Sequence, residues 1–79
     1  MIKNRDLCQE WLNEIERLYG KDRRDKSNAY YDRGWYCIGL ATKYSDGSIG
    51  CQDWMLQHYR EKELIKIIET LKKRNKNDG

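Results

Sequence analysis

The hydrophobic positions of this chain follow a helical period at both ends and an alternating period in the middle. Over residues 5–19 the apolar side chains recur every three to four positions, so they fall on one face of a helix. Asn4 is a suitable N-cap, and Asp6 places a carboxylate in the first turn. Gly20 suits the left-handed backbone conformation that commonly ends a helix. This pattern predicts a first helix over residues 5–19, anchored by Trp11.

A stretch without any apolar residue follows this helix. Residues 21–28 read Lys-Asp-Arg-Arg-Asp-Lys-Ser-Asn. Such a run has no side chain with which to cover a core, so we expect a basic, solvated loop over residues 21–28.

The middle of the chain favours antiparallel strands. Asp46-Gly47 lies between two runs rich in aromatic and aliphatic residues, which is the strongest short-range signal for a β-hairpin. Ala29-Tyr30-Tyr31 predicts a further short strand, and Asp32-Arg33-Gly34 predicts a three-residue turn with glycine at the position of positive φ. We therefore expect a three-stranded antiparallel meander with strands at about 28–31, 35–44 and 48–55.

The register of the predicted hairpin stays open. A two-residue loop at Asp46-Gly47 would pair Tyr44 with Ile49, and a three-residue loop shifts every pair by one. Gly39 and Gly50 stand inside the predicted strands, where glycine indicates a bulge or the close approach of a bulky group.

Both faces of the long predicted strand carry apolar bulk. Tyr36, Ile38 and Leu40 alternate with Trp35 and Cys37. A sheet with one wet face alternates more sharply between apolar and polar residues. Either helices cover both faces of this sheet, or one face meets a partner.

From Tyr59 onward the helical period returns. Leu64, Ile68 and Leu71 form an apolar stripe between charged residues. The pattern predicts a helix over about residues 60–74 and a frayed tail over residues 75–79. The resulting order of helix, three strands and helix indicates an α+β fold, in which two helices pack an antiparallel meander in a single small domain over residues 1–79.

Composition changes this picture in one respect. The chain of 79 residues is 37% charged and has no Pro or Phe, which resembles a disordered protein, but three Trp and six Tyr supply anchors for a core. A domain of this size buries only ~60–65% of the surface of its unfolded chain. We therefore expect a small, aromatic core.

Cysteine and histidine usage argues against a metal site. Cys8, Cys37 and Cys51 include no Cys-x-x-Cys pair, and His58 is the single histidine, so the spacing of a zinc site is missing. We interpret the cysteines as small buried hydrophobes in a reducing compartment. No run approaches ~18 apolar residues, and the first twenty residues do not read as a signal peptide. We expect a cytoplasmic protein without membrane contact.

The sequence also argues against an enzyme. Cys37 or Cys51 with His58 and Asp53 is the sole Cys-His-Asp set, and no local signature or Gly-rich elbow supports it. Residues 45–50 have the chemistry of a hairpin and lack that of a phosphate-binding loop. We expect a protein that works by binding, without a cofactor.

Positive charge gathers in two segments. One surrounds a pair of tyrosines and the other ends the last helix, and basic residues interleaved with aromatic ones bind phosphates and stack bases. Asp22, Asp25 and Asp32 interrupt the first segment. The candidates for binding phosphate or an acidic surface are Lys21, Arg23, Arg24, Lys26, Arg33, Lys72, Lys73 and Arg74.

The aromatic residues suggest a second kind of surface. Trp, Tyr and Arg anchor protein interfaces, although small domains also use aromatic residues because each one buries a large area. A homodimer would likewise cover a second face of the sheet. The candidates for contact with a protein partner are Tyr30, Tyr31, Trp35, Tyr36 and Trp54.

In its order of elements the chain resembles a double-stranded-RNA-binding domain. That family opens its second helix with a Lys-Lys-x-Ala-Lys type of run, whereas this sequence reads Tyr59-Arg-Glu-Lys-Glu-Leu64, with acids interleaved. The resemblance therefore stops at the outline, and no binding residue is carried over from it.

In overall character the chain resembles small proteins of phages and mobile elements of low-GC bacteria. It is a tiny single domain, rich in Lys and Asn and free of motifs. Many such proteins inhibit host defence stoichiometrically, anti-CRISPR proteins among them. The resemblance implies an inhibitor that docks on a larger host protein or ribonucleoprotein. The alternative is a small nucleic-acid-binding accessory protein that uses the two basic segments.

Overall fold

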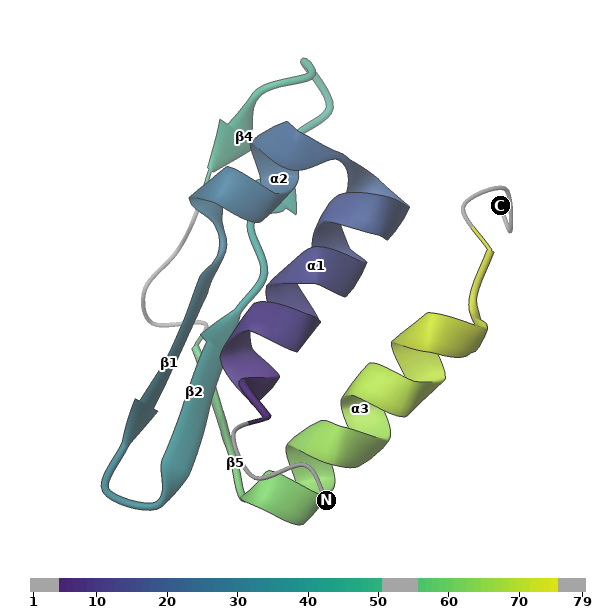
Figure 1. Ribbon diagram of the computed structural model, residues 1–79. Helices are drawn as coiled ribbons and strands as arrows, with labels where there is room; N and C mark the ends of the chain where they lie inside the picture. Colours follow the sequence, from purple (N-terminus) through teal and green to yellow (C-terminus); the bar gives the residue numbers. More distant parts are fainter. Residues whose placement is uncertain (1–4, 51–55, 76–79) are drawn as a thin grey trace.

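The computed structural model describes residues 5–50 and 56–75. Strands β1, β2 and β5 form one antiparallel sheet in that order, and β3 and β4 form a separate two-stranded ribbon. Helices α1 and α3 lie along the same side of the sheet (Figure 1). This arrangement confirms the α+β class and the three-stranded antiparallel sheet. The elements are α1 (Leu7–Tyr19), α2 (Lys21–Lys26), β1 (Asn28–Asp32), β2 (Trp35–Gly39), β3 (Thr42–Lys43), β4 (Ile49–Gly50), β5 (Gln57–Tyr59) and α3 (Glu61–Lys73).

Helix α1 confirms the first predicted helix. Asn4, the expected N-cap, lies outside the described residues, and Asp6 caps the helix because its carboxylate accepts the backbone N–H of Gln9 at 3.1 Å. Gly20, with a φ of 97°, ends the helix, and its N–H donates to the carbonyl of Glu16 at 2.9 Å.

The loop expected over residues 21–28 is wrong in form, because Lys21–Lys26 fold as the short helix α2. Lys and Arg are good helix formers, and Arg23 is also held from outside the helix. Its guanidinium lies 4.4 Å from the ring centroid of Tyr19. No residue of α2 is buried, as expected for a solvated segment.

The sheet is organised around the turn between β1 and β2. Asp32 pairs with Trp35, so the turn has two residues, Arg33 and Gly34, and not the predicted three. Their φ angles are 50° and 88°. Two successive positive φ values are typical of a type I′ turn, whose twist matches that of the flanking strands.

The long strand predicted over residues 35–44 is interrupted after Gly39. The backbone N–H of Ala41 donates to Ser27 Oγ at 3.0 Å, and its carbonyl accepts Arg23 Nε at 2.8 Å. Because side chains occupy both backbone groups, Ala41 has none left for a strand partner. Of the strand predicted over residues 48–55, the structure shows β4, and residues 51–55 lie outside the described part. The third strand of the sheet is β5, which the sequence pattern missed.

The ribbon β3–β4 contains the predicted Asp46-Gly47 reversal. Lys43 pairs with Ile49, and the N–H of Tyr44 donates to the carbonyl of Ser48 at 2.8 Å. The loop therefore has three residues, which decides the register that the sequence left open. Gly47 has a φ of 92°, as the last residue of such a loop requires.

Helix α3 begins after Arg60, whose N–H donates to Glu63 Oε1 at 2.9 Å, and matches the helix predicted over about 60–74. Of the tail predicted to fray, residues 76–79 lie outside the described part. No helix within residues 5–50 and 56–75 has the length and apolar character needed to cross a membrane. The core cluster between the helices and the sheet consists of Leu7, Trp11, Ile15, Ile38, Leu64 and Ile68.

Different side chains pack on the two faces of the sheet. Ile38 points into the core, while its neighbour Cys37 lies on the opposite face, between Tyr30 and His58 of the adjacent strands. On that face a Cβ added to Gly39 would lie 2.5 Å from Leu56 Cδ2. The glycine inside this strand thus reflects close approach, as one of the two sequence interpretations held.

The two described tryptophans provide a matched test of the core. Trp11 is 4% exposed and Trp35 is 38% exposed. We expect Trp11→Ala to lower the free energy of unfolding by about 3–5 kcal/mol, because it leaves a cavity among buried side chains. Trp35→Ala should cost clearly less in the same urea titration. Equal losses would contradict the placement of Trp11 at the centre of the core.

The contact between Gly39 and Leu56 is open to a double-mutant cycle. We expect Gly39→Ala to destabilise the protein by about 1–3 kcal/mol through overpacking. The same substitution in a Leu56→Ala background should cost less, because the clashing Cδ2 is gone. Urea unfolding of the four proteins measures the coupling. Additive effects would show that Leu56 does not lie over Gly39.

Candidate functional site

Three large exposed side chains surround the β1–β2 turn. Tyr30 is 46% exposed, Tyr31 59% and Trp35 38%. The two-residue turn brings the ends of β1 and β2 together, so the three aromatic residues of these two strands share one end of the sheet. Tyr30 and Trp35 lie on the face of Cys37, and Tyr31 lies on the face of Tyr36. We call Tyr30, Tyr31 and Trp35, with the Arg33-Gly34 turn between them, the aromatic tip.

The aromatic tip is held in place by its neighbours. The guanidinium of Arg60 lies 3.8 Å from the ring centroid of Trp35, and its Nη1 donates to the carbonyl of Gly34 at 3.2 Å. The rings of Tyr31 and Tyr36 are 4.7 Å apart and tilted by 58°. These contacts restrain two of the three exposed rings, Trp35 and Tyr31.

Of the two remaining predicted protein-contact residues, only Tyr36 is described, and it belongs to the core side of the sheet. Tyr36 packs against the core cluster under the helices, where burial raises the pKa of its phenol and the nearby carboxylate of Glu61 raises it further. The ring of Tyr36 therefore links Tyr31 to the core side of the sheet. Trp54 lies outside the described residues.

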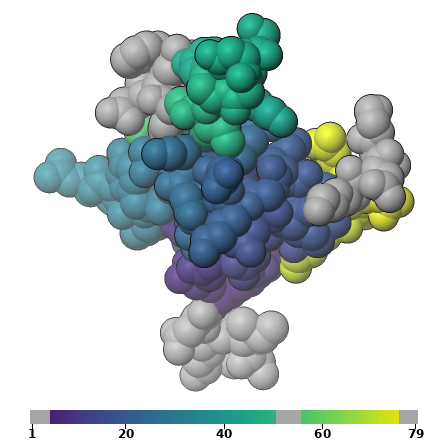
Figure 2. Space-filling view, turned by 90° about the horizontal axis from the view of Figure 1, so that it is seen from above, coloured from purple at the N-terminus to yellow at the C-terminus, as the bar shows by residue number. Residues whose placement is uncertain are grey.

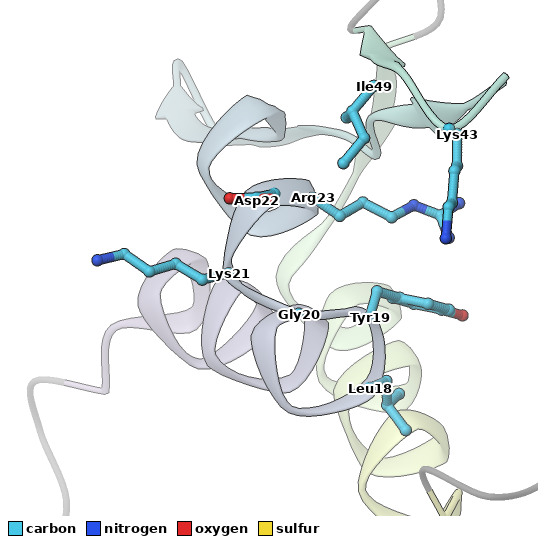
Figure 3. A pocket seen from close by; sticks show the side chains of 9 residues that line it. Leu18, Tyr19, Gly20, Lys21, Asp22, Arg23, Lys43 and Ile49 are labelled. Carbon is cyan, nitrogen blue, oxygen red and sulfur yellow. The ribbon is translucent and has the colours of Figure 1, made fainter.

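A second candidate surface forms where the α1–α2 corner meets the β3–β4 ribbon. In Figure 2 the ribbon rises from the surface of α1 and α2, and the end of α3 borders the same surface. A pocket of about 530 Å³ lies at this place and is shown in Figure 3. We call it the basic pocket. Its lining residues are Leu18, Tyr19, Gly20, Lys21, Asp22, Arg23, Lys43, Gly47 and Ile49.

The side chains of the basic pocket point in different directions. Figure 3 shows Arg23, Lys43 and Tyr19 on the same side of the α1–α2 corner, whereas Lys21 extends the opposite way. Arg23 comes from α2, Lys43 from β3 and Tyr19 from the end of α1. The two cations thus reach the pocket from separate elements.

Tyr19 joins the two basic segments of the sequence. Arg23 from the first segment lies over its ring at 4.4 Å. Arg74 from the second segment lies 5.9 Å from the ring centroid, and its Nη1 donates to the phenol oxygen at 3.0 Å. Arg17 adds support, because its guanidinium donates to the carbonyls of Leu71 and Arg74 at 2.7 and 3.0 Å. Arg23 and Arg74, which are distant in the sequence, therefore meet at Tyr19 on one positive surface.

Some of these basic residues lie near a carboxylate and others do not. Arg17 lies 2.8 Å from a Glu14 oxygen, and Arg24 lies 3.1 Å from Asp25. Over the described residues, no carboxylate is within ion-pair distance of Arg23, Lys43 or Arg74. Within residues 5–50 and 56–75, no ion pair balances the positive charge of these three residues around Tyr19.

The other predicted basic residues contribute less to this pocket. Arg24 is turned to Glu16 and Asp25, and Lys72 lies 3.6 Å from Glu10. Lys26 and Lys73 are exposed. Arg33 belongs to the aromatic tip, at the end of the molecule away from α2 (Figure 1). The structure therefore divides the predicted set between two surfaces.

The Cys-His-Asp set considered from the sequence is only partly described. Cys37 faces His58 across β2 and β5, but it is 3% exposed and the structure records no hydrogen bond between them. Cys51 and Asp53 lie outside the described part. Among the residues that are described, no three His, Cys, Asp or Glu side chains gather as metal ligands would.

Comparison of this chain with models of protein families, with curated proteins and with solved structures finds no match. The functional argument therefore rests on the two surfaces.

Tyr19 is the residue whose role the sequence did not indicate, and it can be tested by stepwise truncation. We expect Tyr19→Phe to lower the free energy of unfolding by about 0.5–1.5 kcal/mol, because it removes the hydrogen bond from Arg74. Tyr19→Leu should cost more, because it also removes the ring on which Arg23 lies. Urea unfolding measures both. If Tyr19→Phe and Tyr19→Leu match the unaltered protein, Tyr19 does not join the segments.

Proposed function

We propose that this protein is a non-enzymatic binding protein that docks on a larger bacterial protein or ribonucleoprotein through its aromatic tip. In this proposal it acts as a phage-type inhibitor of host defence, of the anti-CRISPR kind. The observation that carries the proposal is the exposure of Tyr30, Tyr31 and Trp35 around one turn.

The chemistry of the aromatic tip suits an interface anchor. Tyr, Trp and Arg dominate the binding energy of protein interfaces, because they bury large areas and retain polar groups for hydrogen bonds. Arg33 stands at the turn itself, and Arg60 lies beside Trp35. A matching partner has an apolar recess for the rings and carboxylates at its rim.

The restraint of the tip also favours binding. Ordering a mobile side chain at an interface costs about 0.5–1.5 kcal/mol. Trp35 is already held by Arg60, and Tyr31 by Tyr36, so part of this cost is met during folding. The type I′ turn fixes the strands that carry them.

A phage-challenge assay tests the inhibitory function. We expect expression of the protein to restore plaque formation by a phage that the CRISPR system of the host otherwise targets. Tyr31→Ser combined with Trp35→Ser should abolish this restoration. Tyr44→Ser is the control, because Tyr44 is 43% exposed but lies on the β3–β4 ribbon. Circular dichroism verifies that both variants remain folded.

The docking step is measured with purified CRISPR effector ribonucleoprotein in a binding titration. Loss of one interface anchor costs about 2 kcal/mol or more, so the double variant should bind at least about 30-fold more weakly than the Tyr44→Ser control. Failure of the unaltered protein to restore plaques or to bind the effector would overturn the proposal. A folded double variant with full activity would overturn the role of the tip. Light scattering that shows a dimer closed over the tip would assign the surface to self-association instead.

A further inference from the structure

We propose that the basic pocket is a second binding site, which takes a phosphate group of a single nucleic-acid strand. The pocket lies at the end of the molecule with α2 and the β3–β4 ribbon, away from the β1–β2 turn (Figure 1). The inference therefore does not depend on docking through the aromatic tip.

Arg23 is positioned for an external acceptor. Its Nε donates to the carbonyl of Ala41 at 2.8 Å in a partly buried contact, and its guanidinium lies over the ring of Tyr19. These two contacts fix the plane of the guanidinium, and the terminal nitrogens have no acceptor among the described residues. A fixed guanidinium plane suits the oxygen geometry of a phosphate.

Two further cations lie at the pocket or at Tyr19. Lys43 lines the pocket from β3, and Arg74 bonds the phenol oxygen of Tyr19 from the end of α3. Asp22 also lines the pocket, yet within the described residues it forms no ion pair with Arg23 or Lys43. Like charges repel, so holding these cations together is unfavourable until an anion enters. A phosphate supplies that anion.

The surroundings of the basic pocket favour a strand over a single small anion. Lys26 of α2 and Lys73 at the end of α3 are exposed, close in sequence to Arg23 and Arg74, so further cations are available to neighbouring phosphates. Leu18 and Ile49 add apolar lining beside the cations, which suits sugars and bases. A volume of about 530 Å³ exceeds what a phosphate needs. Binding along a charged track with apolar contacts is typical of single-strand recognition.

The test uses fluorescence anisotropy with a labelled single-stranded RNA oligonucleotide, and DNA of the same sequence in a parallel arm. The affected variant is Arg23→Gln with Lys43→Gln. The matched control is Lys62→Gln with Lys66→Gln, which removes the same charge from exposed positions of α3. We expect the affected variant to bind at least about 10-fold more weakly than the control at the same salt concentration.

Salt dependence identifies the contacts as phosphate contacts. Each phosphate neutralised on a single strand contributes about −0.7 to the slope of log affinity against log salt. Loss of the one phosphate contact in Arg23→Gln with Lys43→Gln should therefore make the slope shallower by about 0.7. The proposal is overturned if Arg23→Gln with Lys43→Gln and the control variant lose the same affinity and show the same salt slope. It is also overturned if the unaltered protein does not bind the oligonucleotide.

Two further arms separate the remaining explanations. Because Arg23 also has structural contacts, Lys43→Gln alone must weaken binding several-fold while thermal unfolding stays unchanged; otherwise the pocket is not the site. Inorganic phosphate and a mononucleotide are added as competitors. If either one displaces the oligonucleotide at a concentration equal to that of the phosphates in the oligonucleotide, the pocket binds free phosphate and the strand proposal is wrong. The tip variant, Tyr31→Ser with Trp35→Ser, should bind the oligonucleotide normally, so failure at one surface is distinguishable from failure at the other.

Discussion

The backbone of Ala41 is held on both sides by side chains from the α2 region, and the layout of the molecule depends on this contact. Ser27 and Arg23 occupy its N–H and carbonyl groups, and Ala41 itself is fully buried. The contact ends β2, so the following residues leave the sheet and form the ribbon. The hydrogen bond from Arg23 to Ala41 also helps to hold the guanidinium over the ring of Tyr19. One local hydrogen-bonding arrangement thus separates the two candidate surfaces and shapes one of them.

Helical periodicity predicted α1 and α3 well, because a one-sided apolar stripe is a local property of the chain. The hairpin signals were less informative. Asp46-Gly47 does form a reversal, but only of the small ribbon, while the main sheet turns at Arg33-Gly34. Arginine seldom adopts a positive φ, so its presence there weakens the signal for a two-residue turn. Helix α2 and the break at Ala41 depend on contacts between segments, which periodicity does not record.

The candidate sites show the same division. Tyr30, Tyr31 and Trp35 were named from residue type alone, and the structure places them together at one exposed end. Tyr36 was named on the same grounds but faces the core. Tyr19 was interpreted only as part of a helical stripe, and its position between Arg23 and Arg74 follows from tertiary packing. Residue type thus indicated the kinds of surface, and only the fold assigns residues to each.

The β3–β4 ribbon has little of its own to hold it. Its strands have two residues each, and neither contributes to the core cluster. Losing its strand pairing would therefore leave the core packing around Trp11 in place. Lys43 belongs to strand β3 of the ribbon, whereas Arg23 and Tyr19 belong to the helices α2 and α1. The basic pocket is thus bounded on one side by α1, which the core cluster holds, and on the other by a ribbon outside that cluster, so a loss of ribbon pairing would alter the pocket before it altered the core.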